Sequence, residues 1–141
     1  MPATTVQIRN VRGTSLAIGA AGNRTVTIDR AISAGGMGLG FNGGELLLLA
    51  LGACFSNDVF REAAKLGITV HDVHVEVSAD WGGEPVIAQN INMSVEVEAD
   101  AEDEVIRNLI EHTNRVAEIP NTLRLSAPVK LHLATKRAQK E

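Results

Sequence analysis

The sequence predicts an α+β domain in which an antiparallel sheet wraps a long central helix. Two observations carry this prediction. Runs of alternating apolar and polar residues, typical of half-buried strands, stand in two separate groups, and two other segments have the composition of helices. The expected order is βββ-α-ββ-α-β, in which strands and helices are segregated along the chain. The 141 residues, 45% of them hydrophobic, suffice for one domain, residues 1–141, with its own core.

Residues 5–29 are expected to form a three-stranded antiparallel meander. Apolar residues alternate there in three short runs, which turn sequences at Gly13 and at residues 21–23 separate. A glycine-rich loop, residues 31–42, then leads to the central helix. Its glycine spacing matches no phosphate-binding motif, so a flexible approach to the helix is the preferred interpretation.

The central helix is expected to run from Asn42 to Gly67. Asn42 is a favoured N-cap residue, Glu45 has the spacing of a capping box, and Gly67 suits the left-handed turn that ends a helix. Nearly every residue from 45 to 53 is apolar, which predicts burial on all sides. One subunit has too little sheet to cover these residues, so a homodimer is expected. Polar residues from Asn57 onward argue against a membrane span.

A long hairpin is expected after the helix. Residues 73–79 and 91–97 alternate strictly and flank a Gly-Gly-Glu-Pro turn sequence at residues 82–85. Each strand has one apolar and one polar face, so one side of the hairpin should meet helices and the other should meet water.

A second helix and a last strand complete the expected fold. Asp100 is a favoured N-cap, and Pro120 should end the helix near Ile119. Alternating apolar residues then predict a strand over residues 129–133.

Composition excludes several classes of function. A net charge of −4 and 3% aromatic residues favour neither nucleic acid nor an anionic membrane as a partner. The single cysteine excludes an internal disulfide and fits a reducing compartment. No signal peptide is recognisable, so a cytoplasmic location is expected.

The histidines give no metal signature. His71 and His74 should point to opposite faces of a strand, and His112 and His132 have no second ligand nearby in sequence. Structural or surface roles are expected for all four, with no metal and no cofactor.

Cys54 is the candidate nucleophile. Its position in mid-helix gives it no help from a helix N-terminus, so a lowered thiol pKa would need a nearby cation. Asp58, one turn later, would raise that pKa if it lay close, and Arg61 is seven residues away. Activation would therefore come from elsewhere in the fold or from a second subunit. A buried structural cysteine is the alternative interpretation.

One stretch carries a family resemblance. From Gly35 to Cys54 it reads Gly-Gly-Met-Gly-Leu-Gly-Phe-Asn-Gly-Gly-Glu-Leu-Leu-Leu-Leu-Ala-Leu-Gly-Ala-Cys, and Asp58-Val59 follows. With the hairpin and second helix, it resembles the OsmC/Ohr family of osmotically inducible and organic-hydroperoxide-resistance proteins. The resemblance implies an OsmC-like fold, an intertwined homodimer with two sites at the subunit interface, and thiol peroxidase chemistry at Cys54.

The resemblance also implies roles for two further residues. Arg12, with Arg24 and Arg9 as alternatives, would take the place of the family's arginine, lowering the pKa of Cys54 and orienting the peroxide. Glu45 would hold this arginine, although helix capping is an equal interpretation of Glu45.

Two departures from the family pattern shape the expected function. Ala117 stands near the expected second cysteine, and Gly44 stands where Ohr proteins carry a glutamate. The expected function is therefore oxidative-stress defence by reduction of organic hydroperoxides through a single cysteine, whose sulfenic acid an external thiol reduces. The alternative is a non-catalytic dimer that binds a small apolar ligand in the interfacial pocket. A purely structural oligomer is the third possibility.

Overall fold

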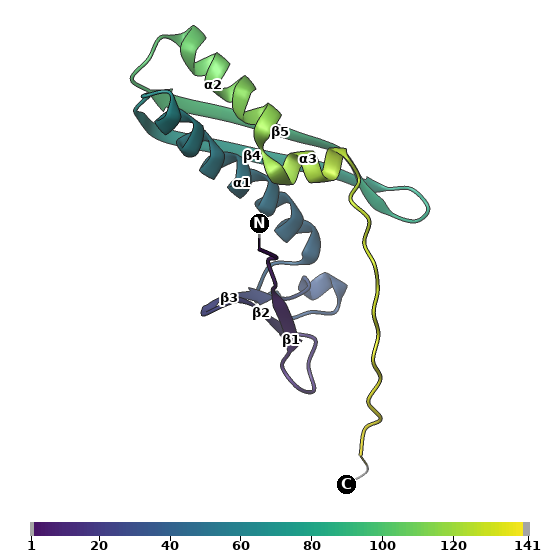
Figure 1. The fold of residues 1–141 in the computed structure, drawn as a ribbon. Helices are drawn as coiled ribbons and strands as arrows, with labels where there is room; N and C mark the ends of the chain where they lie inside the picture. Colours follow the sequence, from purple (N-terminus) through teal and green to yellow (C-terminus); the bar gives the residue numbers. More distant parts are fainter. Residues whose placement is uncertain (1, 140–141) are drawn as a thin grey trace.

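The computed structural model describes residues 2–139, so Met1, Lys140 and Glu141 of the expected domain lie outside the described residues. Its class is α+β, as predicted. The elements are β1 (Gln7–Asn10), β2 (Ala17–Ala21), β3 (Arg24–Ile28), the 3-10 turn η1 (Ile32–Ala34), α1 (Gly43–Lys65), β4 (Val70–Gly82), β5 (Ile87–Ala99), α2 (Asp103–Val116) and α3 (Glu118–Arg124). All three α-helices lie on one side of the long β4–β5 hairpin, and the small β1–β3 sheet lies beyond the N-terminal end of α1 (Figure 1).

The N-terminal meander is confirmed as an antiparallel sheet in the order β1-β2-β3. The loop that follows it is anchored rather than flexible. Buried Asp29 accepts hydrogen bonds from the backbone N–H groups of Arg30 (2.7 Å), Met37 (3.1 Å) and Leu39 (3.0 Å). These bonds lower the pKa of Asp29, the bond from Leu39 most of all, and hold the loop in one conformation.

Helix α1 begins with the predicted capping box. The Glu45 N–H donates to Asn42 Oδ1 (2.8 Å), and the Asn42 N–H donates to Glu45 Oε1 (3.0 Å). At the other end Gly67 has a φ of +69°, the left-handed conformation expected there. Gly52 allows α1 to lie close on β4, because a Cβ at this position would lie 3.2 Å from Val77 Cγ2.

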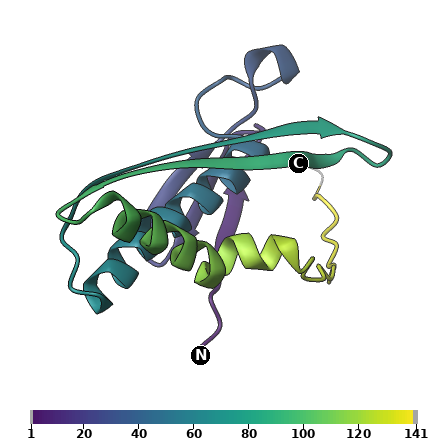
Figure 2. The same cartoon turned by 90° about the horizontal axis from the view of Figure 1, so that it is seen from above.

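The core is formed by the C-terminal two-thirds of α1. Phe55, Val59 and Ala63 are buried against Leu109 of α2 and Ala117. The β4–β5 hairpin lies over α1 and α2 (Figure 2), and its apolar side chains pack against this cluster, as the alternation predicted. The length and composition of α1 would also allow it to cross a membrane, contrary to the expectation from its polar residues. Core helices of globular domains meet the same criterion, and α1 is the core helix here.

The expected burial of residues 45–53 on all sides is wrong for the single chain. Only Leu51 is buried among them, and Leu49 is 49% exposed, because the hairpin covers one face of this half and the rest has no cover among the described residues.

The second helix differs from the prediction at both ends. Its N-cap is Glu102 rather than Asp100, and it ends at Val116 because Ala117 is extended (φ −66°, ψ 122°). Pro120 does not end this helix. It lies in the first turn of α3, where a missing N–H costs no helical hydrogen bond.

The predicted last strand is wrong for the described chain. Residues 129–133 run away from the body without regular structure, and Val129, Leu131 and Leu133 are 98%, 86% and 77% exposed (Figure 1). Alternation predicts a strand only where a partner strand is available, and within the described chain this segment pairs with none.

Candidate functional site

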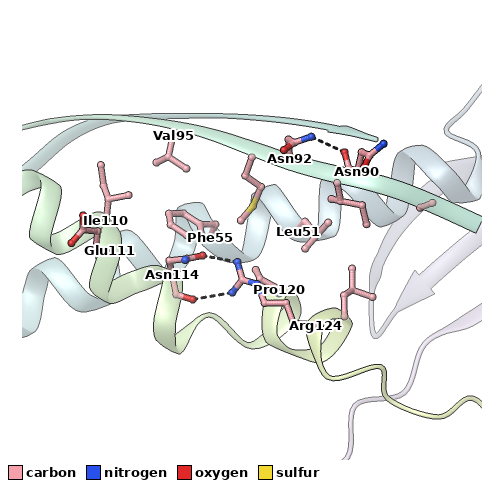
Figure 3. A pocket seen from close by; sticks show the side chains of 14 residues that line it. Leu51, Phe55, Asn90, Asn92, Val95, Ile110, Glu111, Asn114, Pro120 and Arg124 are labelled. Atoms are coloured by element: carbon pink, nitrogen blue, oxygen red, sulfur yellow. Dashed lines mark hydrogen bonds between the residues drawn. The ribbon is translucent and has the colours of Figure 1, made fainter. Parts of the chain in front are cut away.

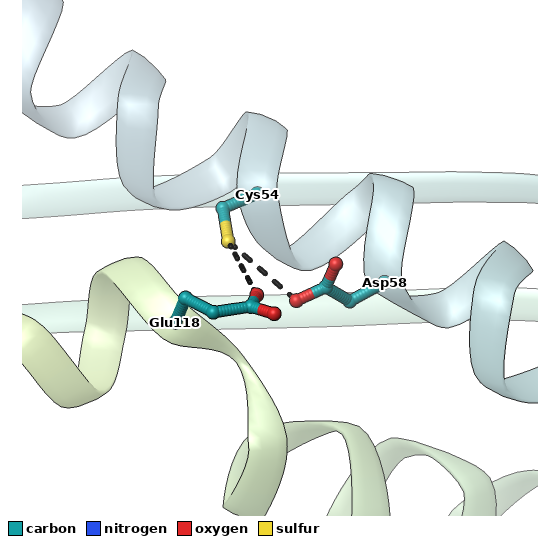
Figure 4. Close-up of side chains that lie close together, drawn as sticks. All are labelled: Cys54, Asp58 and Glu118. Atoms are coloured by element: carbon teal, nitrogen blue, oxygen red, sulfur yellow. Dashed lines mark hydrogen bonds between the residues drawn. The ribbon is translucent and has the colours of Figure 1, made fainter. Parts of the chain in front are cut away.

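The Cys54 thiol lies against two neighbouring carboxyl groups. It is half-buried on α1, and its Sγ is 3.5 Å from Asp58 Oδ2, one turn along the same helix. A second carboxyl oxygen, Glu118 Oε2 from the start of α3, is 3.8 Å from Sγ and lies beside the Asp58 carboxyl group (Figure 4). The break between α2 and α3 at Ala117 brings Glu118 to this position.

Arg61 pairs with both carboxyl groups. Its Nη1 lies 3.2 Å from Asp58 Oδ1 and 3.0 Å from Glu118 Oε1. The guanidinium is therefore a counterion to the carboxyl groups and makes no hydrogen bond to the sulfur itself.

Buried Glu62 holds Arg61 in this orientation. Its Oε2 accepts from Arg61 Nε (3.0 Å) and Lys65 Nζ (2.9 Å), and its Oε1 lies 2.8 Å from Nε2 of His112 on α2. Hydrogen bonds with Lys65, His112 and Arg61 lower the pKa of Glu62 from its ordinary 4.5 to about 2. Glu62 is thus ionised, and it joins the site to α2.

The surroundings of Cys54 favour the protonated thiol. Burial raises its pKa above the ordinary value, and the charges of Asp58 and Glu118 raise it further, while a hydrogen bond with the backbone of Ile119 acts against them. The expected lowering of this pKa is therefore not found within the described chain.

Asp58 and Glu118 differ in their affinity for a proton. Burial, and then the hydrogen bond and charge of Glu118, raise the pKa of Asp58. The pKa of Glu118 is lowered by three hydrogen bonds: one with the backbone N–H of Glu118 itself, one with Asp58 and one with Arg61. When the pair holds one proton, that proton therefore belongs on Asp58.

Arg12 and Glu45 lie apart from this cluster. Arg12 is exposed in the turn between β1 and β2, and the Glu45 carboxylate is bonded to the Asn42 N–H. No hydrogen bond or ion pair among residues 2–139 links Arg12, Arg9, Arg24 or Glu45 to Cys54. Cys54 lies about three turns into α1, whereas the small sheet lies beyond the start of that helix.

The four histidines do not gather. His71 pairs with Asp100 (2.9 Å), which raises the pKa of His71, and His112 pairs with Glu62. A different group of possible metal ligands does exist. The donor atoms of Cys54, Asp58 and Glu118 lie within 4.8 Å of one another, and together they could bind a divalent metal ion. Arg61 already pairs with both carboxyl groups and would compete with such an ion.

A groove of mixed polar and apolar lining opens between β5 and the three helices. Its volume is about 670 Å³, its floor includes Leu51 and Phe55, and Arg124 stands at its edge, donating to Asn114 Oδ1 (2.7 Å) (Figure 3). Cys54 is not among its lining residues.

The family model described as OsmC-like protein matches residues 35–132, more than half of the chain. The chain belongs to the OsmC family. Solved structures agree with this at the level of the fold. An OsmC-like protein from Mycoplasma pneumoniae has a TM-score of 0.76 at 19% identity, with 87% of this chain and 88% of that chain covered.

Organic hydroperoxide resistance proteins are also among the structural neighbours of this OsmC-family chain. The protein OhrB from Bacillus subtilis has a TM-score of 0.62 at 20% identity over 94% of this chain and 98% of its own. A protein from Legionella pneumophila described as organic hydroperoxide resistance protein OsmC has a TM-score of 0.60 at 19% identity, with coverages of 88% and 90%. No curated protein matches the chain.

Both departures from the OsmC/Ohr pattern have a structural counterpart. A Cβ at Gly44 would lie 2.8 Å from Trp81 Cζ2, so the ring of Trp81 occupies the space that a longer side chain would need. Ala117 is buried, and the residue after it brings a carboxylate, Glu118, against Cys54.

The sequence missed Glu118 as a neighbour of Cys54. Asp58 could be placed by its i, i+4 spacing, but the contact of Glu118 depends on how α3 packs against α1, for which no local pattern exists. Sequence spacing places Arg61 two turns from Cys54, and in the structure it pairs with the carboxyl groups next to the sulfur.

Proposed function

We propose that this protein reduces organic hydroperoxides through Cys54 alone, as a defence against oxidative stress. The observation that carries the proposal is a half-buried thiol in contact with two carboxyl groups, on the central helix of an OsmC-family domain. The family includes organic hydroperoxide resistance proteins, and such proteins are among the structural neighbours.

The reaction needs a peroxide and two equivalents of an external thiol. The Cys54 sulfur attacks the terminal oxygen of ROOH, the O–O bond breaks, and ROH leaves, so that Cys54 becomes a sulfenic acid. One external thiol then forms a mixed disulfide with Cys54 and releases water. A second external thiol attacks that disulfide and restores Cys54, so the sum is ROOH + 2 R′SH → ROH + H₂O + R′SSR′.

The proposal places the site in a homodimer. Leu49 on α1 and the run 129–133 expose apolar side chains that a second copy would cover. In the dimer Arg12, or alternatively Arg24 or Arg9, reaches Cys54 from the other subunit and orients the peroxide. Glu45 either holds that arginine or serves helix capping only.

Turnover tests this function. With dithiothreitol as reductant, wild-type protein should convert cumene hydroperoxide to cumyl alcohol faster than it consumes hydrogen peroxide, because apolar residues of α1 such as Leu49 would line the approach to the site at the proposed dimer interface. Cys54→Ser should abolish turnover and leave the circular dichroism spectrum unchanged. Arg12→Ala should slow turnover more than Arg24→Ala or Arg9→Ala. Equal alcohol production by wild type and Cys54→Ser would refute the proposal.

A non-catalytic dimer that binds a small apolar ligand is the second candidate. The observations that favour it are the raised pKa of Cys54, which disfavours the thiolate, and the groove of about 670 Å³ with its apolar floor. On this reading Cys54→Ser should bind an apolar fluorescent probe as tightly as the wild type, and neither protein should consume peroxide.

A further inference from the structure

The proposed reaction requires two proton movements that Cys54 cannot perform by itself. Its thiol must lose a proton before the sulfur attacks, and the alkoxide released from the peroxide must gain one. The surroundings of Cys54 hold the thiol protonated, so a group that moves this proton has to lie within reach of the sulfur.

We propose that Asp58 is this group and acts as the proton shuttle of the reaction. Its Oδ2, 3.5 Å from Sγ, accepts the thiol proton, the sulfur attacks the terminal peroxide oxygen, and the Asp58 carboxyl returns the proton to the departing alkoxide oxygen. The products are the Cys54 sulfenic acid and ROH, and Asp58 ends as it began. This inference rests on the proposed function and adds a catalytic residue to it.

Geometry favours Asp58 over Glu118 in this role. The Asp58 side chain is 8% exposed, so water competes little for its carboxyl group, whereas the Glu118 side chain is 60% exposed. Asp58 is also the nearer of the two to the sulfur, at 3.5 Å against 3.8 Å. Because Asp58 lies on the same helix as Cys54, their contact does not depend on the placement of α3.

The groups around Asp58 suit a carboxyl group that gains and loses one proton. Cys54 and Arg61 face it from α1, and Glu118 faces it from α3. Its pKa is raised by burial and by Glu118, which makes it a stronger base than an ordinary aspartate. Arg61, held by Glu62, offsets part of the negative charge of the cluster.

A shuttle and a merely electrostatic neighbour predict opposite effects of Asp58→Asn. The Asp58 charge raises the pKa of Cys54, so its removal should yield more thiolate at neutral pH. If Asp58 acts only through its charge, the variant should attack hydroperoxides faster. If Asp58 protonates the leaving alkoxide, the variant should attack them more slowly although its thiolate forms more readily.

Three reagents separate these effects at one pH. Iodoacetamide releases iodide and a peroxy acid releases a carboxylate, neither of which needs a proton, whereas cumene hydroperoxide releases an alkoxide that does. For Asp58→Asn we expect a loss of about 10²-fold with cumene hydroperoxide, the lower end of general acid catalysis. With iodoacetamide and peracetic acid its rates should equal or exceed those of the wild type. Asp72→Asn, which removes one exposed charge on β4, should match the wild type with all three reagents.

Each outcome decides a separate claim. Two results would overturn the shuttle and leave the proposed function standing. One is an Asp58→Asn rate with cumene hydroperoxide at or above that of the wild type. The other is an equal loss of rate with all three reagents. A wild type that reacts with iodoacetamide but not with any hydroperoxide would overturn the proposed function itself.

A wild-type measurement serves if Asp58→Asn does not fold. A shuttle makes the rate depend only weakly on the pKa of the alcohol released from a series of hydroperoxides. If the rate depended on the pKa of the alcohol as steeply as it does for a small free thiol, the shuttle would be overturned.

Discussion

Carboxyl groups, not cations, make the direct side-chain contacts of the Cys54 sulfur among the described residues. Cys54 thus resembles neither an inert core cysteine, which has apolar neighbours, nor a thiol activated by an adjacent arginine. A nucleophile in this setting has to exchange its proton with a neighbouring base rather than lose it permanently. The cations of the cluster lie one step further out, on the carboxyl groups and on Glu62.

Glu62 should make the stability of the protein depend on pH. Its pKa falls from 4.5 to about 2 on folding, so its contribution is complete above about pH 4.5 and is lost as the pH falls through about 2. Glu62→Gln should therefore lower the free energy of unfolding at pH 7, and its difference from the wild type should shrink between pH 4.5 and pH 2. Urea denaturation at several pH values measures this difference.

Glu76→Gln is the control for that experiment, because Glu76 lies on the exposed face of β4. Its difference from the wild type should be small throughout. If the Glu62→Gln difference stayed constant over this pH range, the ionised cluster would not be the source of the stabilisation.

At the scale of single residues, the sequence predicted what local spacing determines. The contact of Asp58 with Cys54 follows from i, i+4 spacing, and the capping pair Asn42–Glu45 follows from i, i+3 spacing. Glu118 and His112 are 64 and 50 residues from their partners on α1, and tertiary packing alone brings them there.

Helix α1 organises the elements, and its start offers a test of Glu45. Asn42→Ala should cost about 1 kcal/mol of stability, whereas Glu45→Gln should keep most of it, because glutamine also serves in a capping box. Chemical denaturation of both variants measures these costs. If Glu45 also holds an arginine at the thiol of the dimer, Glu45→Gln should raise the Cys54 pKa, which the ultraviolet absorbance of the thiolate reports.

The elements themselves were predicted where their pattern was long and periodic. The meander, α1 and the β4–β5 hairpin are confirmed, with strand ends that differ by a few residues. The misplaced features lie at residues 100–133, where an extended Ala117 divides one expected helix into two and the expected last strand has no partner. Both depend on contacts distant in sequence, which a local pattern does not contain.

The whole molecule exposes more apolar surface than its fold requires. Leu49, Phe41 and Phe60 along or beside α1 are 49%, 44% and 46% exposed, and the run 129–133 is almost fully exposed. We expect a homodimer with a large apolar interface, and sedimentation at micromolar concentration should give twice the mass of the chain. A stable folded monomer there would contradict this expectation.

A pair of substitutions locates the dimer interface. Leu49→Glu should weaken the dimer, because it places a charge on the uncovered half of α1, whereas Ser94→Glu on the exposed face of β5 should leave it intact. If both variants sedimented as dimers, Leu49 would not lie in the dimer interface.

If Cys54 attacks organic hydroperoxides, its thiol must be consumed by them. Wild-type protein should be exposed to excess cumene hydroperoxide without reductant, and its free thiol and dimedone adduct should be measured by mass spectrometry. We expect that the thiol is lost, that dimedone traps a sulfenic acid at Cys54, and that added dithiothreitol restores the thiol in untrapped protein. A full thiol count after prolonged exposure would contradict the proposed attack by Cys54.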